Sequence, residues 1–204
     1  MSLHADIKDQ RPGRPSVRIK TVVIVRSAQA ASDFPNHRIH PLTVAGRRQA
    51  EERRRKLGDV SYDFIFHSPL SRGRETAAIV AEPDSADETI VVSSLYPPDE
   101  DPRVQMMERL LDELGYVPLR EYFAHGGEDA IMGIAREAHA AIAGALQSRE
   151  WTDALIVGHG PLVPALGAAF CGQPNFVDMA FGECEGIRLR LSNDGAKIMA
   201  WESI

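Results

Sequence analysis

The chain has little of what a disulfide-stabilised or membrane-spanning protein needs. Its 204 residues include only two cysteines, Cys171 and Cys184, which form no CxxC motif. The sequence therefore predicts neither a disulfide framework nor a thiolate metal site, and it fits a reducing, cytoplasmic compartment. No apolar run approaches the ~20 residues that cross a bilayer. Residues 1–20 lack the apolar core of a secretory signal, and we expect them to form a disordered tail.

An excess of positive charge is also absent. Lysine and arginine number 23 against 29 acidic residues, which gives a net charge of −6 and a pI of about 5.6. This balance argues against a nucleic-acid-binding protein and gives no reason to expect a membrane partner. The contents of 44% hydrophobic and 25% charged residues are ordinary for a globular protein. We therefore expect one domain over residues 21–204, which needs no metal for stability.

Apolar segments with the lengths of strands and helices alternate along the chain. The β-branched segment Thr21–Val25 predicts a strand that is covered on both faces. Further strands are predicted at Asp63–His67, Glu88–Val92, Asp153–Val157, Gly186–Leu191 and Ala196–Trp201. Helices are predicted at Val44–Leu57 with Thr43 as N-cap, Ser68–Ala81, Arg103–Leu114, Glu128–Gln147 and Leu162–Phe170. This alternation predicts an α/β three-layer sandwich with a mostly parallel central sheet flanked by helices.

Cationic and polar residues follow three of the predicted strands. Arg26 and Ser27 come after the first, Arg72 lies in the helix after the second, and His159 follows the fourth. The carboxyl ends of parallel strands meet at one edge of a sheet, where ligands bind in this class of fold. Guanidinium groups pair with phosphate oxygens, and helix N-termini add positive potential. The sequence therefore predicts a phosphate site formed by Arg26, Arg72 and His159.

Four segments resemble those of the histidine phosphatase superfamily, which is also called phosphoglycerate-mutase-like. They are VRSAQA (25–30), PLTVAG (41–46), SPLSRGRETA (68–77) and VGHG (157–160), and the third is the most specific. The spacing is most similar to that of the short bacterial phosphohistidine phosphatases. The resemblance covers Thr21 to Ala81 and Asp153 to Trp201, whereas residues 96–150 match loosely and are interpreted as a variable insertion. It implies the same α/β sandwich fold.

The resemblance also implies roles for the residues at the strand ends. In the family, a histidine after the first arginine attacks phosphorus and becomes a phosphohistidine, while two arginines and a second histidine hold the phosphate oxygens. Arg26, Arg72 and His159 match the phosphate-holding positions, but Ser27 stands at the nucleophile position. Ala28 also replaces a usual glycine, and Gln29 a common acid. The expected pocket keeps its phosphate contacts and lacks its attacking imidazole.

Other polar residues are weaker candidates for the site. Many family members draw a general acid from the loop after the third strand, where Glu100 lies between Asp99 and Asp101. His40, or the nearby Arg38, is a candidate for added positive charge beside the phosphate. Exposed loop positions are the alternative explanation for all of these residues. A further expectation is that His37 and His67 take no part in catalysis, and no metal or cofactor is expected.

Three functions remain open at this point. The first is a catalytically impaired protein that binds phosphate, a phosphorylated small molecule or a phosphorylated protein. The second is an active phosphatase for phosphohistidine or small phosphomonoesters that uses Ser27 or water. A serine hydroxyl needs a base, and His159 is the only obvious one. The third is a non-catalytic interaction module that keeps only the fold.

Overall fold

A computed structural model of the chain describes residues 19–33, 35–81, 86–172, 174–195 and 197–204. The disordered tail predicted for residues 1–20 therefore lies almost entirely outside the described residues. Across the described ranges, none of the helices combines the length and the hydrophobicity that a bilayer crossing requires.

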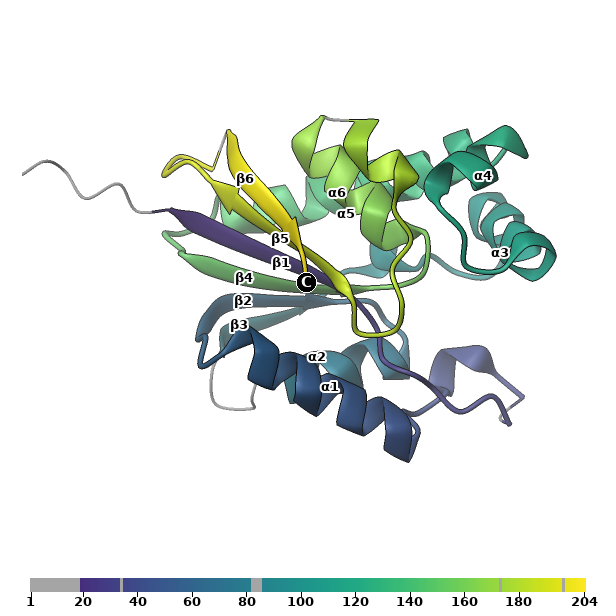
Figure 1. Cartoon of the computed structure of the whole chain (residues 1–204), viewed down its shortest axis with the longest axis horizontal. Coiled ribbons are helices and arrows are strands. Elements are labelled where there is room, and N and C mark those ends of the chain that lie inside the picture. The colour runs from purple at the N-terminus through teal and green to yellow at the C-terminus, as the bar shows by residue number, and fades with distance from the viewer. Residues whose placement is uncertain (1–18, 34, 82–85, 173, 196) are drawn as a thin grey trace, which may run out of the picture.

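Six strands form one mixed sheet in the order β3-β2-β4-β1-β5-β6 (Figure 1). The strands β1, β2, β3 and β4 run parallel, whereas β5 runs antiparallel to both of its neighbours, β1 and β6. Their bounds are Lys20–Arg26 (β1), Tyr62–His67 (β2), Ala86–Val91 (β3), Asp153–Gly158 (β4), Gly186–Leu191 (β5) and Ile198–Ser203 (β6). The predicted mostly parallel sheet is confirmed. All four parallel strands deliver their carboxyl ends to the same edge.

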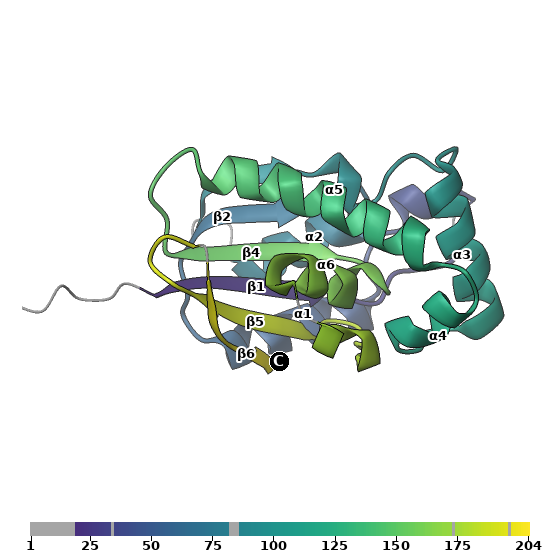
Figure 2. The same ribbon diagram turned by 90° about the horizontal axis from the view of Figure 1, so that it is seen from above.

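Helices cover both faces of this sheet and one of its edges (Figures 1 and 2). α1 (Val44–Leu57) and α2 (Ser71–Ala81) lie on one face, and α5 (Glu128–Leu146) and α6 (Leu162–Cys171) on the other. α3 (Pro102–Leu114) and α4 (Leu119–Ala124) lie beyond the carboxyl ends of the parallel strands. Short 3-10 helices span His37–Ile39, Ser93–Leu95 and Pro174–Asp178. The arrangement is the predicted three-layer sandwich, with two helices placed over the edge where a site was expected.

Two helix predictions need correction. The helix after β2 begins at Ser71 and not at Ser68, because the Ser68 hydroxyl accepts the backbone N–H of Leu70 and holds a turn there. α4 was not predicted at all. It has six residues, and a segment of that length is too short to show helical periodicity.

The core explains why β1 reads as an unbroken apolar run. Val22 and Ile24 belong to the apolar cluster that includes buried side chains of α5 and α6. Val23 and Val25 belong to the cluster that includes those of α1 and α2. A third apolar cluster joins α3 and α4 to α5 and α6, and its members include Val104, Leu110, Tyr122, Ile131 and Leu162. This third cluster fixes α3 and α4 over the carboxyl ends of the strands.

Thr43 caps α1 and also holds the loop that follows β1. Its hydroxyl accepts the N–H of Gly46 at 2.9 Å and donates to the side-chain oxygen of Gln29 at 2.9 Å. We predict that Thr43→Ala lowers the free energy of unfolding by about 1 kcal/mol, the usual cost of a lost N-cap. Thr43→Ser is the matched control and should retain most of this stability in urea denaturation. Equal midpoints for native protein and Thr43→Ala would show that the cap contributes nothing.

Candidate functional site

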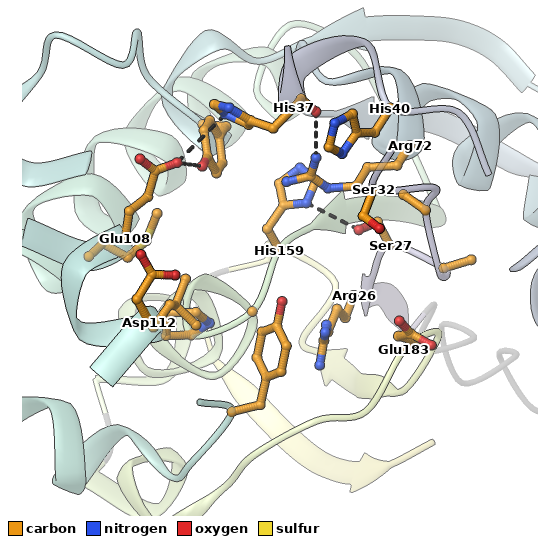
Figure 3. Close-up of a pocket in the computed structure, with 18 of the residues that line it drawn as sticks. Arg26, Ser27, Ser32, His37, His40, Arg72, Glu108, Asp112, His159 and Glu183 are labelled. Carbon is orange, nitrogen blue, oxygen red and sulfur yellow. Dashed lines mark hydrogen bonds and ion pairs between the residues drawn. The ribbon is translucent and has the colours of Figure 1, made fainter. Parts of the chain in front are cut away.

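The strand register brings the predicted site residues together. Arg26 of β1 lies beside Gly158 of β4, and the N–H of Ser27 donates to the carbonyl of Gly158 at 2.9 Å. Ser27 and His159 therefore lie next to each other just beyond the two strands. α2, which follows β2, brings Arg72 to the same edge. Together these side chains line a pocket of about 500 Å³ (Figure 3).

His159 is held between two serine hydroxyls. Its Nδ1 lies 3.1 Å from Oγ of Ser27, and its Nε2 lies 2.5 Å from Oγ of Ser68. Ser68 is fully buried, and Ser27 and His159 are 5% and 6% exposed. The rings of His159 and Tyr96 form a T-shaped pair, with 5.3 Å between the centroids. These contacts fix the imidazole on both sides.

The two arginines form no ion pair with a carboxylate in the described part of the chain, although the charge of Glu108 acts to raise the pKa of Arg72. Arg26 is 7% exposed, donates to the carbonyl of Phe181 at 2.9 Å and lies over the ring of Tyr116, 3.6 Å from its centroid. Arg72 donates to the carbonyl of His37 at 2.9 Å, and burial lowers its pKa. Moving a cation from water into a protein interior without a counter-ion costs several kcal/mol of free energy. The arrangement is suited to receive an anion.

The same charges determine the protonation of His159. Burial, followed by the positive charges of Arg72 and Arg26, holds the pKa of this imidazole well below its usual value of 6.5. His159 is therefore neutral at pH 7, with one ring nitrogen that donates and one that accepts. If Nε2 carries the proton, the Ser27 hydroxyl donates to Nδ1. If Nδ1 carries it, Ser27 accepts from His159 and its own proton points elsewhere.

The SPLSRGRETA segment holds the loop after β1 against α2. The hydroxyl of Thr76 accepts the N–H of Ala28 at 3.0 Å and donates to the carbonyl of Arg72 at 2.7 Å. Gly73 lies so close to His159 that an added Cβ would be 2.4 Å from Oγ of Ser68. Only glycine at this position leaves the contact between Ser68 and His159 undisturbed.

The PLTVAG segment supports that loop from the other side. The N–H of Thr43 donates to the carbonyl of Gln29 at 3.0 Å, and the side-chain oxygen of Gln49 accepts the N–H of Gln29 at 3.0 Å. A Cβ at Gly46 would be 2.0 Å from that same carbonyl oxygen. These contacts hold the loop that contains Ser27 in position.

The weaker candidates have mixed outcomes. His40 lines the pocket, and so does His37, for which no catalytic part was expected. Glu100 is exposed and is not among the lining residues, so the structure does not bring it to the pocket. Arg38 pairs with Asp99 at 2.6 Å and is not a lining residue either. In the ranges that the structure describes, no three His, Cys, Asp or Glu side chains gather closely enough to hold a metal ion.

Sequence reasoning missed the part of the pocket that α3 and its flanking loops supply. The hydroxyl of Tyr96 donates to Oε1 of Glu108, and the pKa of Tyr96 is raised, chiefly by burial, so this hydroxyl stays protonated. Nε2 of His37 lies 3.6 Å from the same carboxylate oxygen. Three more lining residues, Asp112, Tyr116 and Glu183, were also missed. None belongs to a motif, and only the amphipathic pattern of α3 gave any signal.

The lowered pKa of His159 predicts how stability depends on pH. The unfolded chain binds the imidazole proton near pH 6.5, whereas the folded chain binds it only at lower pH. Stability is therefore fully present above about pH 6.5 and decreases as the pH falls below that value. In phosphate-free buffer, the native protein should lose up to about 1.4 kcal/mol per pH unit more than His159→Gln. His125→Gln, at an exposed histidine, should retain the native slope; identical slopes for all three proteins would contradict a buried neutral His159.

Comparison with known proteins gives two results. A family model described as the histidine phosphatase superfamily (branch 1) matches residues 24–95. No curated protein sequence matches this chain significantly.

Solved structures share the fold at low sequence identity. A putative phosphohistidine phosphatase SixA from Nakamurella multipartitia has 18% identity and a TM-score of 0.58, covering 90% of this chain and 95% of its own. The protein histidine phosphatase SixA complexed with tungstate has 19% identity and a TM-score of 0.55, with coverages of 90% and 96%. A mycobacterial glucosyl-3-phosphoglycerate phosphatase in complex with VO3 has 21% identity and a TM-score of 0.60, with coverages of 90% and 97%. This chain is therefore similar to the histidine phosphatase superfamily over residues 24–95, and it shares the fold of these solved structures over about 90% of its length.

Proposed function

We propose that this protein binds the phosphate group of a phosphorylated ligand through Arg26, Arg72 and His159, and hydrolyses it slowly or not at all. The observation that carries the proposal is the pair of guanidinium groups in one pocket, neither of them paired with a carboxylate of the described residues. A bound oxyanion would supply the missing negative charge. The tungstate and VO3 complexes of two proteins with this fold support an oxyanion as the ligand.

Ser27 is the reason to propose impaired hydrolysis. Its side chain is shorter than an imidazole, and its hydroxyl is protonated at neutral pH. Loss of a covalent nucleophile typically costs several orders of magnitude in rate, although binding and charge stabilisation survive. When Nδ1 of His159 carries the proton, Ser27 accepts from it and its own hydroxyl is free to donate to an oxyanion. In that arrangement Ser27 is a binding group.

A second candidate function is a phosphatase with Ser27 as nucleophile, and the 3.1 Å contact between Ser27 and His159 favours it. The required tautomer has its proton on Nε2, which donates to Ser68. Ser27 Oγ then forms a bond to phosphorus while the bond from phosphorus to the leaving oxygen breaks. The Ser27 proton passes to Nδ1 and from there to the departing oxygen. Water would hydrolyse the phosphoserine in a second step, with His159 again as base.

Binding of tungstate tests the phosphate site. We predict that Arg72→Gln weakens tungstate binding by about 10- to 100-fold, the effect of losing a charged hydrogen-bond partner. Arg74→Gln is the matched control, because Arg74 lies two residues further on the same helix, is exposed and does not line the pocket. Titration calorimetry should separate the two variants. If the native protein bound no tungstate, the proposal would fail. A non-catalytic interaction module would then be the remaining candidate function.

Restoring the imidazole tests the role of position 27. We predict that Ser27→His gains turnover of p-nitrophenyl phosphate and accumulates an acid-labile phosphoryl adduct in the intact mass spectrum. Ser27→Asn, which adds bulk without a nucleophile, should gain neither. The second candidate predicts the opposite pattern: native turnover that Ser27→Ala abolishes, with an acid-stable adduct on the native protein. Native turnover at an ordinary enzymatic rate would contradict the proposal of impaired hydrolysis.

A further inference from the structure

The pocket holds more negative than positive side chains. Its cationic floor, formed by Arg26, Arg72 and His159, is nevertheless suited to an anion. Two guanidiniums, Arg26 and Arg72, stand among three carboxylates: Glu108, Asp112 and Glu183. No ion pair joins these two groups of charges among the described residues. Figure 3 shows Glu108 and Asp112 on one side of the pocket and Glu183 beyond Arg26 on the other. The carboxylates and the guanidiniums therefore line different parts of the pocket and do not form ion pairs with each other.

Glu108 and Asp112 form an acidic wall on α3. They are four residues apart, so they lie on the same face of the helix, a spacing at which two like charges destabilise it slightly. Glu108 is positioned by the Tyr96 hydroxyl, which leaves its second oxygen without a described partner. Asp112 makes no hydrogen bond or ion pair with a described residue. Tyr96 and the apolar cluster beneath α3 hold this wall in place.

The cationic floor is an independent sign that a ligand belongs here. Arg26 is more than nine-tenths buried, and the Phe181 carbonyl is the only hydrogen-bond partner of its guanidinium in the described part of the chain. Arg26 also lines the pocket. A volume of about 500 Å³ lies within the ~300–1,000 Å³ range of small-molecule sites, so there is room for an organic group beside a phosphate.

We propose that the ligand is a small phosphomonoester that carries a positively charged amine, with its phosphate on the floor and its amine against the acidic wall. This inference rests on the proposed function, because it takes the phosphate position from it. A phosphate dianion adds to the excess of carboxylates, and an alkyl ammonium group, charged at pH 7, offsets part of that excess. A second carboxylate on the ligand would be repelled by Glu108 and Asp112. The pocket thus selects zwitterionic over polyanionic phosphoesters.

Three probes of similar size and different charge test this selectivity. They are O-phosphoethanolamine, ethyl phosphate and phosphoglycolate, each titrated into the full chain in low-salt buffer without other phosphate. O-phosphoethanolamine should bind about fivefold more tightly than ethyl phosphate, and phosphoglycolate more weakly than both, as expected for partly exposed charge pairs. The differences should shrink at high salt.

Variants of the wall link the selectivity to its residues. Asp112→Asn should reduce the preference for the amine about threefold. Glu113→Gln, at the next position of α3 and outside the pocket, should keep the native preference. Glu108→Gln should also lose preference, and it provides a second variant if Asp112→Asn does not fold.

The outcomes separate the two proposals. If tungstate binds and the three probes bind equally, the acidic wall has no role and this inference is wrong, although the proposed function stands. If the native protein binds neither tungstate nor any probe, the proposed function fails and this inference fails with it. A phosphoserine peptide with a neighbouring lysine carries the same chemistry. If it bound more tightly than its norleucine counterpart and than O-phosphoethanolamine, the amine selectivity would hold, and the source would be a protein and not a metabolite.

Discussion

The site depends on two guanidinium groups that the fold places at one edge of the sheet, neither of them in an ion pair with a carboxylate of the described chain. Arg26 ends β1 and is buried, Arg72 comes from α2, and His159 follows β4. The parallel register of β1, β2 and β4 brings the three together. Because burial and the two arginines lower the pKa of His159, this imidazole stays neutral, and the pocket gains positive potential mainly from two guanidiniums. An anion is the natural complement of this arrangement.

Within this environment, one proton on His159 decides what Ser27 can do. With the proton on Nε2, the Ser27 hydroxyl points at a base and has the geometry of a nucleophile. With the proton on Nδ1, the same hydroxyl becomes a donor to the bound oxyanion. Ser68 satisfies His159 in both cases, because a hydroxyl can donate or accept. The difference between a binding protein and a slow phosphatase is therefore a tautomer and the length of one side chain.

The order of strands and helices and most of the site floor could be predicted from the sequence. The strand at Thr21–Val25, the helix capped by Thr43 and the convergence of Arg26, Ser27 and His159 follow from local patterns that the tertiary structure obeys. The wall of the pocket could not be predicted, because Glu108 belongs to no motif and reaches the site only through the packing of α3 on α5. Glu100 illustrates the reverse: its position in the chain suggested the pocket, but its side chain is exposed and does not line it.

A crystal structure grown with tungstate tests the central claim most directly. The account predicts a single tungsten peak in the anomalous map at the carboxyl edge of the sheet. Its oxygens should accept hydrogen bonds from Arg26 and Arg72 and contact His159 and Ser27. Tungstate bound elsewhere, or a pocket in which the two guanidiniums point away from each other, would contradict the claim that they hold one oxyanion.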